Sequence, residues 1–123
     1  MVKNLTPAKQ RKEWQTRPRW RITRGGRIAL GPGKADLLEA IDRTHAISRA
    51  AADLGMSYRR AWLLVAEMNA CFREPLVSTS RWRGEGASLT SAGRRALILY
   101  RRIEIDSLTA ARAPIRRLQA LLT

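Results

Sequence analysis

Two adjacent arginines, Arg59 and Arg60, begin a segment of helical spacing directly after a short polar turn. Guanidinium groups bind phosphates and guanine edges through paired hydrogen bonds, so the pair points to chemistry with a nucleic acid. Two cations in the first turn of a helix also oppose the helix dipole, and a nearby anion relieves that cost. The alternative is a solvent-exposed basic face. Of the two, Arg59 is the better candidate for a base or phosphate contact.

Further candidates lie around this pair. The hydroxyl groups of Ser57 and Tyr58 can bind phosphate or a base edge, while Ser57 also suits the role of helix cap. Trp62, one turn along, is expected either to pack against a neighbouring helix or wing, or to contact DNA. Arg49, in the preceding segment, completes this set of predicted DNA-binding residues.

A second basic group lies in the stretch RWRGEG at residues 81–86, between the strand candidates Leu76–Thr79 and Ala87–Leu89. A basic tip with glycine between two strands is typical of a β-wing. We therefore expect Arg81 and Arg83 to bind phosphate or the minor groove, with an inert surface as the alternative. Trp82, between them, is expected to pack on the strands of the wing.

The sequence has few residues that could support catalysis, metal binding or redox chemistry. Cys71 and His45 are the only residues of their types, so the sequence offers no nucleophile–base set and no cluster of metal ligands. It also contains no glycine-rich phosphate loop. Cys71 is interpreted as a small buried hydrophobe at a helix end, with a redox-sensitive thiol near Arg73 as the alternative. We expect no enzyme activity, no metal and no cofactor.

Composition indicates one folded domain with an anionic partner. The chain has 123 residues, of which 45% are apolar, enough for a real core. Twenty-four Lys and Arg against ten Asp and Glu give a net charge of +14, which favours nucleic acid first and an anionic membrane second. One cysteine, no signal-peptide pattern and no membrane-spanning run predict a cytoplasmic, nucleoid-associated protein without a membrane partner.

The spacing of apolar residues changes near residue 34, and this change predicts the first elements of the fold. Alternation from Arg19 to Leu30 on both sides of Gly25-Gly26 predicts a β-hairpin, which the residues GPG at 31–33 end. From Lys34 a helix of about ten residues follows. Its acidic residues are expected to point away from a bound polyanion; they are Asp36, Glu39 and Asp42.

The next segment predicts a helix-turn-helix. Ser48 is the expected cap of a short helix, Arg49–Leu54, which Gly55 ends. Ser57 then caps a second helix, Tyr58–Cys71. Two helices joined by a short turn with glycine have the helix-turn-helix layout. The small or apolar residues expected to face the common core are Ala51, Leu54, Met56, Ala61, Leu64 or Val65, and Met68.

The C-terminal part predicts assembly. Thr90 caps a longer helix, and Pro114 breaks or kinks it. The apolar residues from 92 to 122 are more than one small domain can cover, so we expect a symmetric homodimer, with a folded-back monomer as the alternative. The residues expected to form this face are Leu97, Tyr100, Ile103, Leu108, Ile115, Leu118, Leu121 and Leu122.

The predicted organisation is therefore a basic flexible leader at residues 1–18, a winged helix-turn-helix at 19–90 and dimerisation helices at 91–123. The fold class is mainly α with a small β component, including an N-terminal β-hairpin.

The stretch from Ile28 to Leu76, continuing to Tyr100, closely resembles the N-terminal DNA-binding domain of molybdate-responsive ModE-type regulators. The most specific parts are GPGKADLLEAI at 31–41, the helix-turn-helix AAADLGMSYRRAW at 50–62, EMN at 67–69 and LTSAG at 89–93. The resemblance covers about two thirds of the chain. It implies a winged helix-turn-helix related to LysR-type domains, with Tyr58–Asn69 as recognition helix and dimerisation through the N-terminal elements and the helix after the wing.

Two departures from this family affect the expected function. Full-length members carry C-terminal oxyanion-binding domains, whereas this sequence ends at Thr123, so we expect a stand-alone domain with no molybdate binding and no evident small-molecule effector. The tip RWRGEG is also shorter and more basic than in relatives. The sequence as a whole predicts a transcriptional regulator that binds specific sites on double-stranded DNA. The alternatives are a nucleoid-type architectural DNA-binding protein of low sequence specificity and a winged-helix module that binds a protein.

Overall fold

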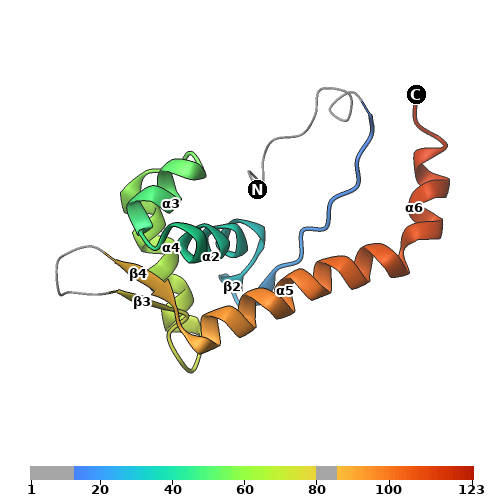
Figure 1. The fold of residues 1–123 in the computed structure, drawn as a ribbon. Coiled ribbons are helices and arrows are strands. Elements are labelled where there is room, and N and C mark those ends of the chain that lie inside the picture. The colour runs from blue at the N-terminus through green and yellow to red at the C-terminus, as the bar shows by residue number, and fades with distance from the viewer. Residues whose placement is uncertain (1–12, 80–85) are drawn as a thin grey trace.

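A computed structural model describes residues 13–79 and 86–123 (Figure 1). The described part is mainly helical with two small antiparallel hairpins, which confirms the winged helix-turn-helix fold. The elements in chain order are β1 (Ile22–Arg24), β2 (Arg27–Leu30), α2 (Pro32–Thr44), α3 (Ile47–Asp53), α4 (Tyr58–Cys71), β3 (Val77–Thr79), β4 (Ala87–Leu89), α5 (Ser91–Ala110) and α6 (Arg112–Gln119).

The core lies where α2, α3 and α4 meet the start of α5. Helix α2 is buried along one face, and the small residues of α3 let it approach both neighbours closely. From α4, the predicted core residues Ala61, Val65 and Met68 are fully buried, while Leu54, Met56 and Leu64 are partly buried against them. The side chains with the largest buried volume are Tyr100, Leu37, Leu38, Ile41, Met68, Leu76 and Val65.

Two helix starts differ from the predicted ones. Helix α2 begins at Pro32, two residues early, because proline suits the first position of a helix, where no N–H is needed. Helix α3 begins at Ile47, so the prediction of Ser48 as its cap was wrong. The Thr44 hydroxyl donates to the carbonyl of Ala40 at 2.7 Å and accepts the N–H of Ala46 at 3.4 Å, which turns the chain before Ser48. Burial of Ile47 then anchors the new helix.

His45 ends α2 in a left-handed conformation, with φ of 58°. Its N–H donates to the carbonyl of Ile41 at 2.8 Å, and its own carbonyl accepts the N–H of Ala87 at 3.0 Å. The single histidine is thus a helix terminus that joins α2 to the wing strand β4. No group of three potential metal ligands occurs among the described residues.

The N-terminal hairpin is confirmed, with a first strand shorter than the pattern predicts. Gly25 has φ of 58°, a conformation that glycine adopts without strain, and makes the turn between β1 and β2. Trp20 lies before β1 and contacts α5 instead, because its indole N–H donates to Ser107 Oγ at 2.9 Å and its carbonyl accepts the Tyr100 hydroxyl at 2.7 Å. Strands β3 and β4 pair in register as the base of the wing.

Helix α5 starts at the Thr90 cap, whose hydroxyl accepts the N–H of Gly93 at 3.0 Å, and extends well beyond the core (Figure 1). It ends at Ala110, four residues before Pro114, because the proline ring clashes with a helical carbonyl at that distance. The predicted break is thereby confirmed, and α6 follows at an angle to α5.

The predicted partner-facing stripe of α5 needs one correction. Tyr100 is 1% exposed and Leu97 is packed against the core, so both belong to the fold of the single chain. Ile103, which the predicted stripe also includes, is 40% exposed, and α5 exposes three further apolar side chains outside that stripe: Ile98, Leu99 and Ile105.

Of the predicted leader, residues 1–12 lie outside the described residues, and residues 13–18 have no helix or strand. Thr16 accepts a hydrogen bond from the Gln119 amide at 3.0 Å, so this segment runs alongside α6. None of the helices in the described ranges is both long and apolar enough to cross a bilayer.

Candidate nucleic-acid interface

Helix α4 presents one fully exposed side, opposite the residues that it buries. At 3.6 residues per turn, Arg59, Leu63 and Ala66 follow one another along this outer line. Arg59 is exposed as predicted, and Leu63 is 56% exposed. Sequence periodicity missed Leu63 because leucine next to a core position looks like core; its displacement from the line of Ala61, Val65 and Met68 was the available signal.

Ser57 caps α4, since its hydroxyl accepts the N–H of Arg60 at 3.1 Å. This bond confirms the cap that the sequence predicts. It also places Tyr58, Arg59 and Arg60 in the first turn, where all three side chains are exposed.

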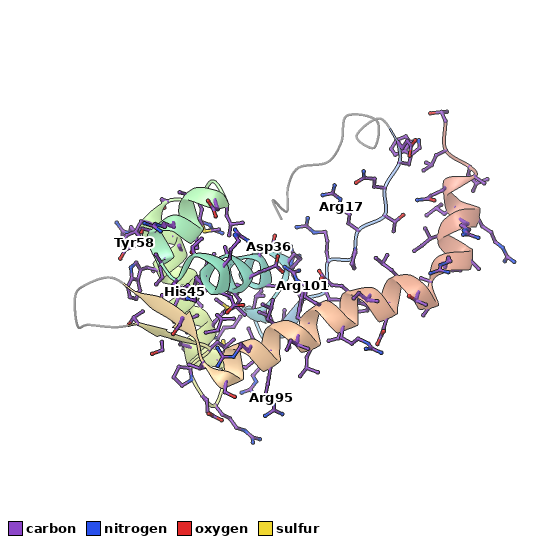
Figure 2. The ribbon with its side chains drawn as sticks, viewed as in Figure 1. Arg17, Asp36, His45, Tyr58, Arg95 and Arg101 are labelled. Atoms are coloured by element: carbon purple, nitrogen blue, oxygen red, sulfur yellow. The ribbon has the colours of Figure 1, made fainter. Side chains whose placement is uncertain are left out.

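One flank of α4 forms what we call the wing-side groove, a hollow of about 680 Å³ between α4, the start of α3 and the wing strands. Tyr58 and Trp62 line it with their rings edge to face, 6.2 Å between centroids and 81° between planes. Arg49 and Thr79 lie on its other walls. Trp62 therefore packs on Tyr58, which is labelled in Figure 2, and the Trp62 residue remains 38% exposed at the groove.

The structure thus brings together three predicted residues, Arg49, Tyr58 and Trp62, at the wing-side groove, and Arg59 follows Tyr58 in the first turn of α4 that Ser57 caps. Arg60 faces the opposite flank. Arg81, Trp82 and Arg83 lie outside the described residues, so the predictions for the wing tip stay predictions.

The opposite flank forms what we call the hairpin cleft, a hollow of about 530 Å³ between α4, the β1–β2 hairpin and the start of α2. Four arginines line it: Arg19, Arg21, Arg27 and Arg60. Arg19, Arg21 and Arg27 were not predicted as site residues, because only the tertiary packing of the hairpin beside α4 gathers them. Their alternation on either side of the glycine turn was the signal.

Lys34 forms the floor of the hairpin cleft and is 6% exposed. Its ammonium group donates to the carbonyl of Ile28 and pairs with Glu67 of α4, with 2.8 Å between Nζ and Oε1. The hydrogen bond and charge of Lys34 lower the pKa of the Glu67 carboxyl below its ordinary value of 4.5. This pair connects α2, β2 and α4 and so sets how the hairpin lies beside the exposed helix.

Asn69 sets the position of the wing relative to α4. Its Oδ1 accepts the N–H groups of Leu76 at 2.8 Å and Val77 at 3.1 Å, and its Nδ2 donates to the carbonyl of Val77 at 3.1 Å. Gly93 is buried below the same segment, where a Cβ would overlap the carbonyl oxygen of Leu76. Asn69 and Gly93 therefore have architectural roles.

Acidic residues gather away from α4, at the contact between α2 and α5. Arg101 of α5 pairs with Asp36 at 2.9 Å, Glu39 at 3.0 Å and Glu104 at 3.0 Å, and Figure 2 shows Asp36 and Arg101 side by side. Burial raises the pKa of both the Asp36 and the Glu39 carboxyl. Because these acids lie against α5, both flanks of α4 keep their positive character.

Cys71, at the end of α4, is half-buried, less covered than the sequence interpretation implies. It lines the hairpin cleft and a smaller neighbouring hollow next to Phe72. Within the described ranges no second cysteine lies near it.

Comparison with known families gives one match over this region. Residues 34–94 match the model of the bacterial regulatory helix-turn-helix protein, lysR family. The match runs from the buried lysine of α2 to the beginning of α5, so it includes the helix-turn-helix and the wing.

Curated relatives match a similar stretch. The chain is 41% identical over 80 residues to the molybdenum transport protein ModE of Azotobacter vinelandii, covering 63% of this chain and 30% of the relative. It is 40% identical over 77 residues to the molybdenum-pterin-binding protein MopB of Rhodobacter capsulatus, covering 61% and 28%. It is 39% identical over 76 residues to the DNA-binding transcriptional dual regulator ModE of Escherichia coli (strain K12), covering 60% and 29%. The match thus spans less than a third of the length of each relative.

Proposed function

We propose that the chain is a DNA-binding transcriptional regulator that recognises specific sites on double-stranded DNA. The match of residues 34–94 to the model of the bacterial regulatory helix-turn-helix protein, lysR family, supports this proposal. The observation that carries this proposal is the outer line of α4, where Arg59 and Leu63 are exposed on a rigid, capped helix. A helix with its side chains is about 10–12 Å across, which fits the major groove of B-DNA at about 12 Å.

In this proposal the outer line of α4 reads bases. Arg59 can donate two hydrogen bonds to the O6 and N7 atoms of guanine. Leu63 and Ala66 offer apolar contacts, which suit the methyl group of thymine. Asp36 and Glu39 of α2 are paired with Arg101 of α5, and Glu67, the carboxylate next to this line on α4, is paired with Lys34.

The wing-side groove anchors the protein on one DNA strand. Arg49 and the Tyr58 hydroxyl lie at its rim, where they can bind phosphate and fix the register of α4. From the sequence, Arg81 and Arg83 at the wing tip add phosphate or minor-groove contacts. These contacts position the protein, whereas the outer line of α4 supplies specificity.

We further propose that the chain acts as a homodimer. Ile98, Leu99 and Ile105 of α5 are 67%, 60% and 60% exposed, and Leu118 of α6 is 63% exposed. Exposed apolar side chains in such number on a helix that projects beyond its core need a covering surface, and a symmetric copy is the commonest one. A dimer would place two copies of α4 on successive turns of DNA.

The test is a binding selection from a random duplex library with the purified chain. We expect one recurrent motif, built of two related half-sites. The Arg59→Ala variant should retain the motif but lose preference at one position, because one bidentate guanine contact is worth about 1–3 kcal/mol of discrimination. If selection returns no motif, the chain is an architectural DNA-binding protein of the kind that its +14 charge also suits.

A further inference from the structure

The hairpin cleft has more positive charge than its surroundings balance. Arg19, Arg21, Arg27 and Arg60 point to one hollow, yet none of their guanidinium groups forms an ion pair or side-chain hydrogen bond within residues 13–79 and 86–123. The one acid in the lining, Glu67, is held by Lys34. Four guanidinium groups around one hollow repel each other, and a bound polyanion would relieve this repulsion.

The position of the cleft identifies the anion. A helix that fills the major groove has a phosphate backbone along each of its two flanks, because the groove is hardly wider than the helix. On α4 these flanks are the wing-side groove and the hairpin cleft. Arg60 lies in the first turn of α4 and on the wall of the hairpin cleft, so the cleft begins where the exposed line of α4 begins.

We propose that the hairpin cleft binds the phosphate backbone of the second DNA strand, on the side of α4 away from the wing. The β1–β2 hairpin would then act as a second wing. Guanidinium groups suit this role because they bind phosphate oxygens through paired hydrogen bonds. The inference rests on the proposed DNA binding, but it requires only that α4 enters the groove and is independent of sequence preference.

The shape of the cleft suits a DNA strand that runs through it better than a small ligand that it would enclose. An added Cβ on Gly31 would be 3.4 Å from Arg21 Cγ, so the stem of the Arg21 side chain packs against the chain just before α2. Gly33, on the cleft wall, is exposed with open space around it. The backbone can therefore approach a phosphate closely.

The test measures the salt dependence of DNA binding by fluorescence anisotropy. Removal of one phosphate contact should lower the slope of log K against log salt by about 0.9 on duplex DNA. For the double variant Arg21→Gln/Arg27→Gln we expect a slope lower by about 1–2 and roughly tenfold weaker binding at moderate salt, on specific and unrelated duplexes alike. The matched control is Arg95→Gln/Arg117→Gln, which removes two exposed arginines outside the cleft and should change the slope by less than half as much.

A second arm locates the phosphate. Duplexes in which single phosphates are replaced by uncharged methylphosphonates should weaken binding of the unmodified protein at positions flanking the motif. The cleft variant should no longer respond to the replacement on the side away from the wing. The proposal would be overturned if the methylphosphonates weakened binding of the cleft variant and of the unmodified protein equally. For this comparison the cleft variant and the control variant must both keep the thermal unfolding temperature of the protein.

A third arm separates DNA phosphate from a free anion. Titration with inorganic phosphate should give only weak, salt-like binding, because no single phosphate spans four arginines. Stoichiometric binding of inorganic phosphate that the cleft variant loses, with an unchanged DNA salt slope, would assign the cleft to a free anion and overturn the proposal. If the random-library selection returns no motif but the cleft still controls the salt slope, sequence specificity fails and this inference stands.

Discussion

Along the outer line of α4, one cation is followed by apolar side chains. Arg59 offers five N–H donors, whereas Leu63 and Ala66 offer only shape and apolar surface. A hydrogen-bonding residue and a methyl-contacting residue on one line distinguish guanine from thymine at neighbouring positions. Ser57 contributes to this discrimination indirectly, because its cap holds the first turn in place.

Leu63 gives a prediction that a chemical change in the DNA can test. Replacing the contacted thymine of the selected site by deoxyuridine removes one methyl group and should weaken binding about fourfold, as expected for about 0.8 kcal/mol per apolar carbon buried. The Leu63→Ala variant should bind the two duplexes equally. Competition binding with the paired duplexes measures both effects. If the change from thymine to deoxyuridine weakens binding of the protein and of Leu63→Ala equally, Leu63 does not contact the methyl group.

Glu67 links the charge state of one carboxyl to the fold. Its pKa is lowered in the folded protein by Lys34, so its contribution to stability is present above the ordinary value of 4.5 and is lost as the pH falls through the lower folded value. The difference in unfolding free energy between the protein and Glu67→Gln should therefore be largest near neutral pH and shrink below about pH 4. The raised pKa values of Asp36 and Glu39 affect both proteins and cancel in this difference.

Urea unfolding at pH 7 and at pH 3.5 measures this change. Glu74→Gln is the matched control, since it removes an exposed carboxyl with no described partner, and it should match the protein at both pH values. If the unfolding free energies of the protein and Glu67→Gln differ by the same amount at both pH values, the charge of Glu67 in its pair with Lys34 contributes nothing to stability.

At the scale of elements, the wing depends on bonds between side chain and backbone. The strands β3 and β4 are three residues each, too short to fix their own position. Asn69 supplies three hydrogen bonds from α4, and the contact of Gly93 with Leu76 sets the distance of α5. These two positions account for the motifs EMN and LTSAG in physical terms.

Asn69→Ala should therefore destabilise the fold. The N–H groups of Leu76 and Val77 would lose their acceptor, at a cost of about 2–4 kcal/mol for two partly buried donors. Chemical unfolding monitored by circular dichroism measures this destabilisation. Ser78→Ala, an exposed change on the same strand, should stay within about 0.5 kcal/mol of the protein. Unchanged stability of Asn69→Ala would show that the wing is held by other contacts.

The elements that sequence reasoning predicted correctly are those with local causes. The start of α4 follows from the Ser57 cap, and the end of α5 follows from Pro114. The start of α3 was missed because Ser48 was the better local cap, while burial of Ile47 and the Thr44 hydroxyl decided the outcome through tertiary and backbone contacts. Of the candidate site, Tyr58, Arg59, Arg60 and Trp62 of α4 were predicted, whereas Leu63 was missed. The arginines of β2 and of the segment before β1 were also missed, since only packing places them beside α4.

For the whole molecule, the proposed DNA face and the proposed dimer face lie on different elements. The basic flanks lie on both sides of α4, whereas Ile98, Leu99, Ile105 and Leu118 are exposed on α5 and α6. One face can therefore bind a polyanion while another meets a second copy. Tyr100, predicted at the dimer contact from periodicity alone, is instead the main α5 residue of the core.

The double variant Ile98→Glu/Ile105→Glu tests the dimer. The two residues are seven apart and lie on the same side of α5, so the change places like charges along the proposed interface. Sedimentation at micromolar concentration should give a dimer for the protein and a monomer for the variant. The variant should bind a single half-site normally but the complete site weakly. Ala52→Glu, an exposed change on α3, should remain dimeric; a monomeric protein that binds the complete site at full affinity would refute the dimer.

Sequence recognition by the outer line of α4 is tested by the ratio of two affinities. The purified chain is titrated at physiological salt with the selected duplex and with a duplex of the same composition in scrambled order. We expect the selected duplex to bind at least about a thousandfold more tightly, and Arg59→Ala to lower this ratio roughly 10- to 100-fold. Equal affinities for the two duplexes, unchanged by Arg59→Ala, would show that the outer line of α4 does not read sequence.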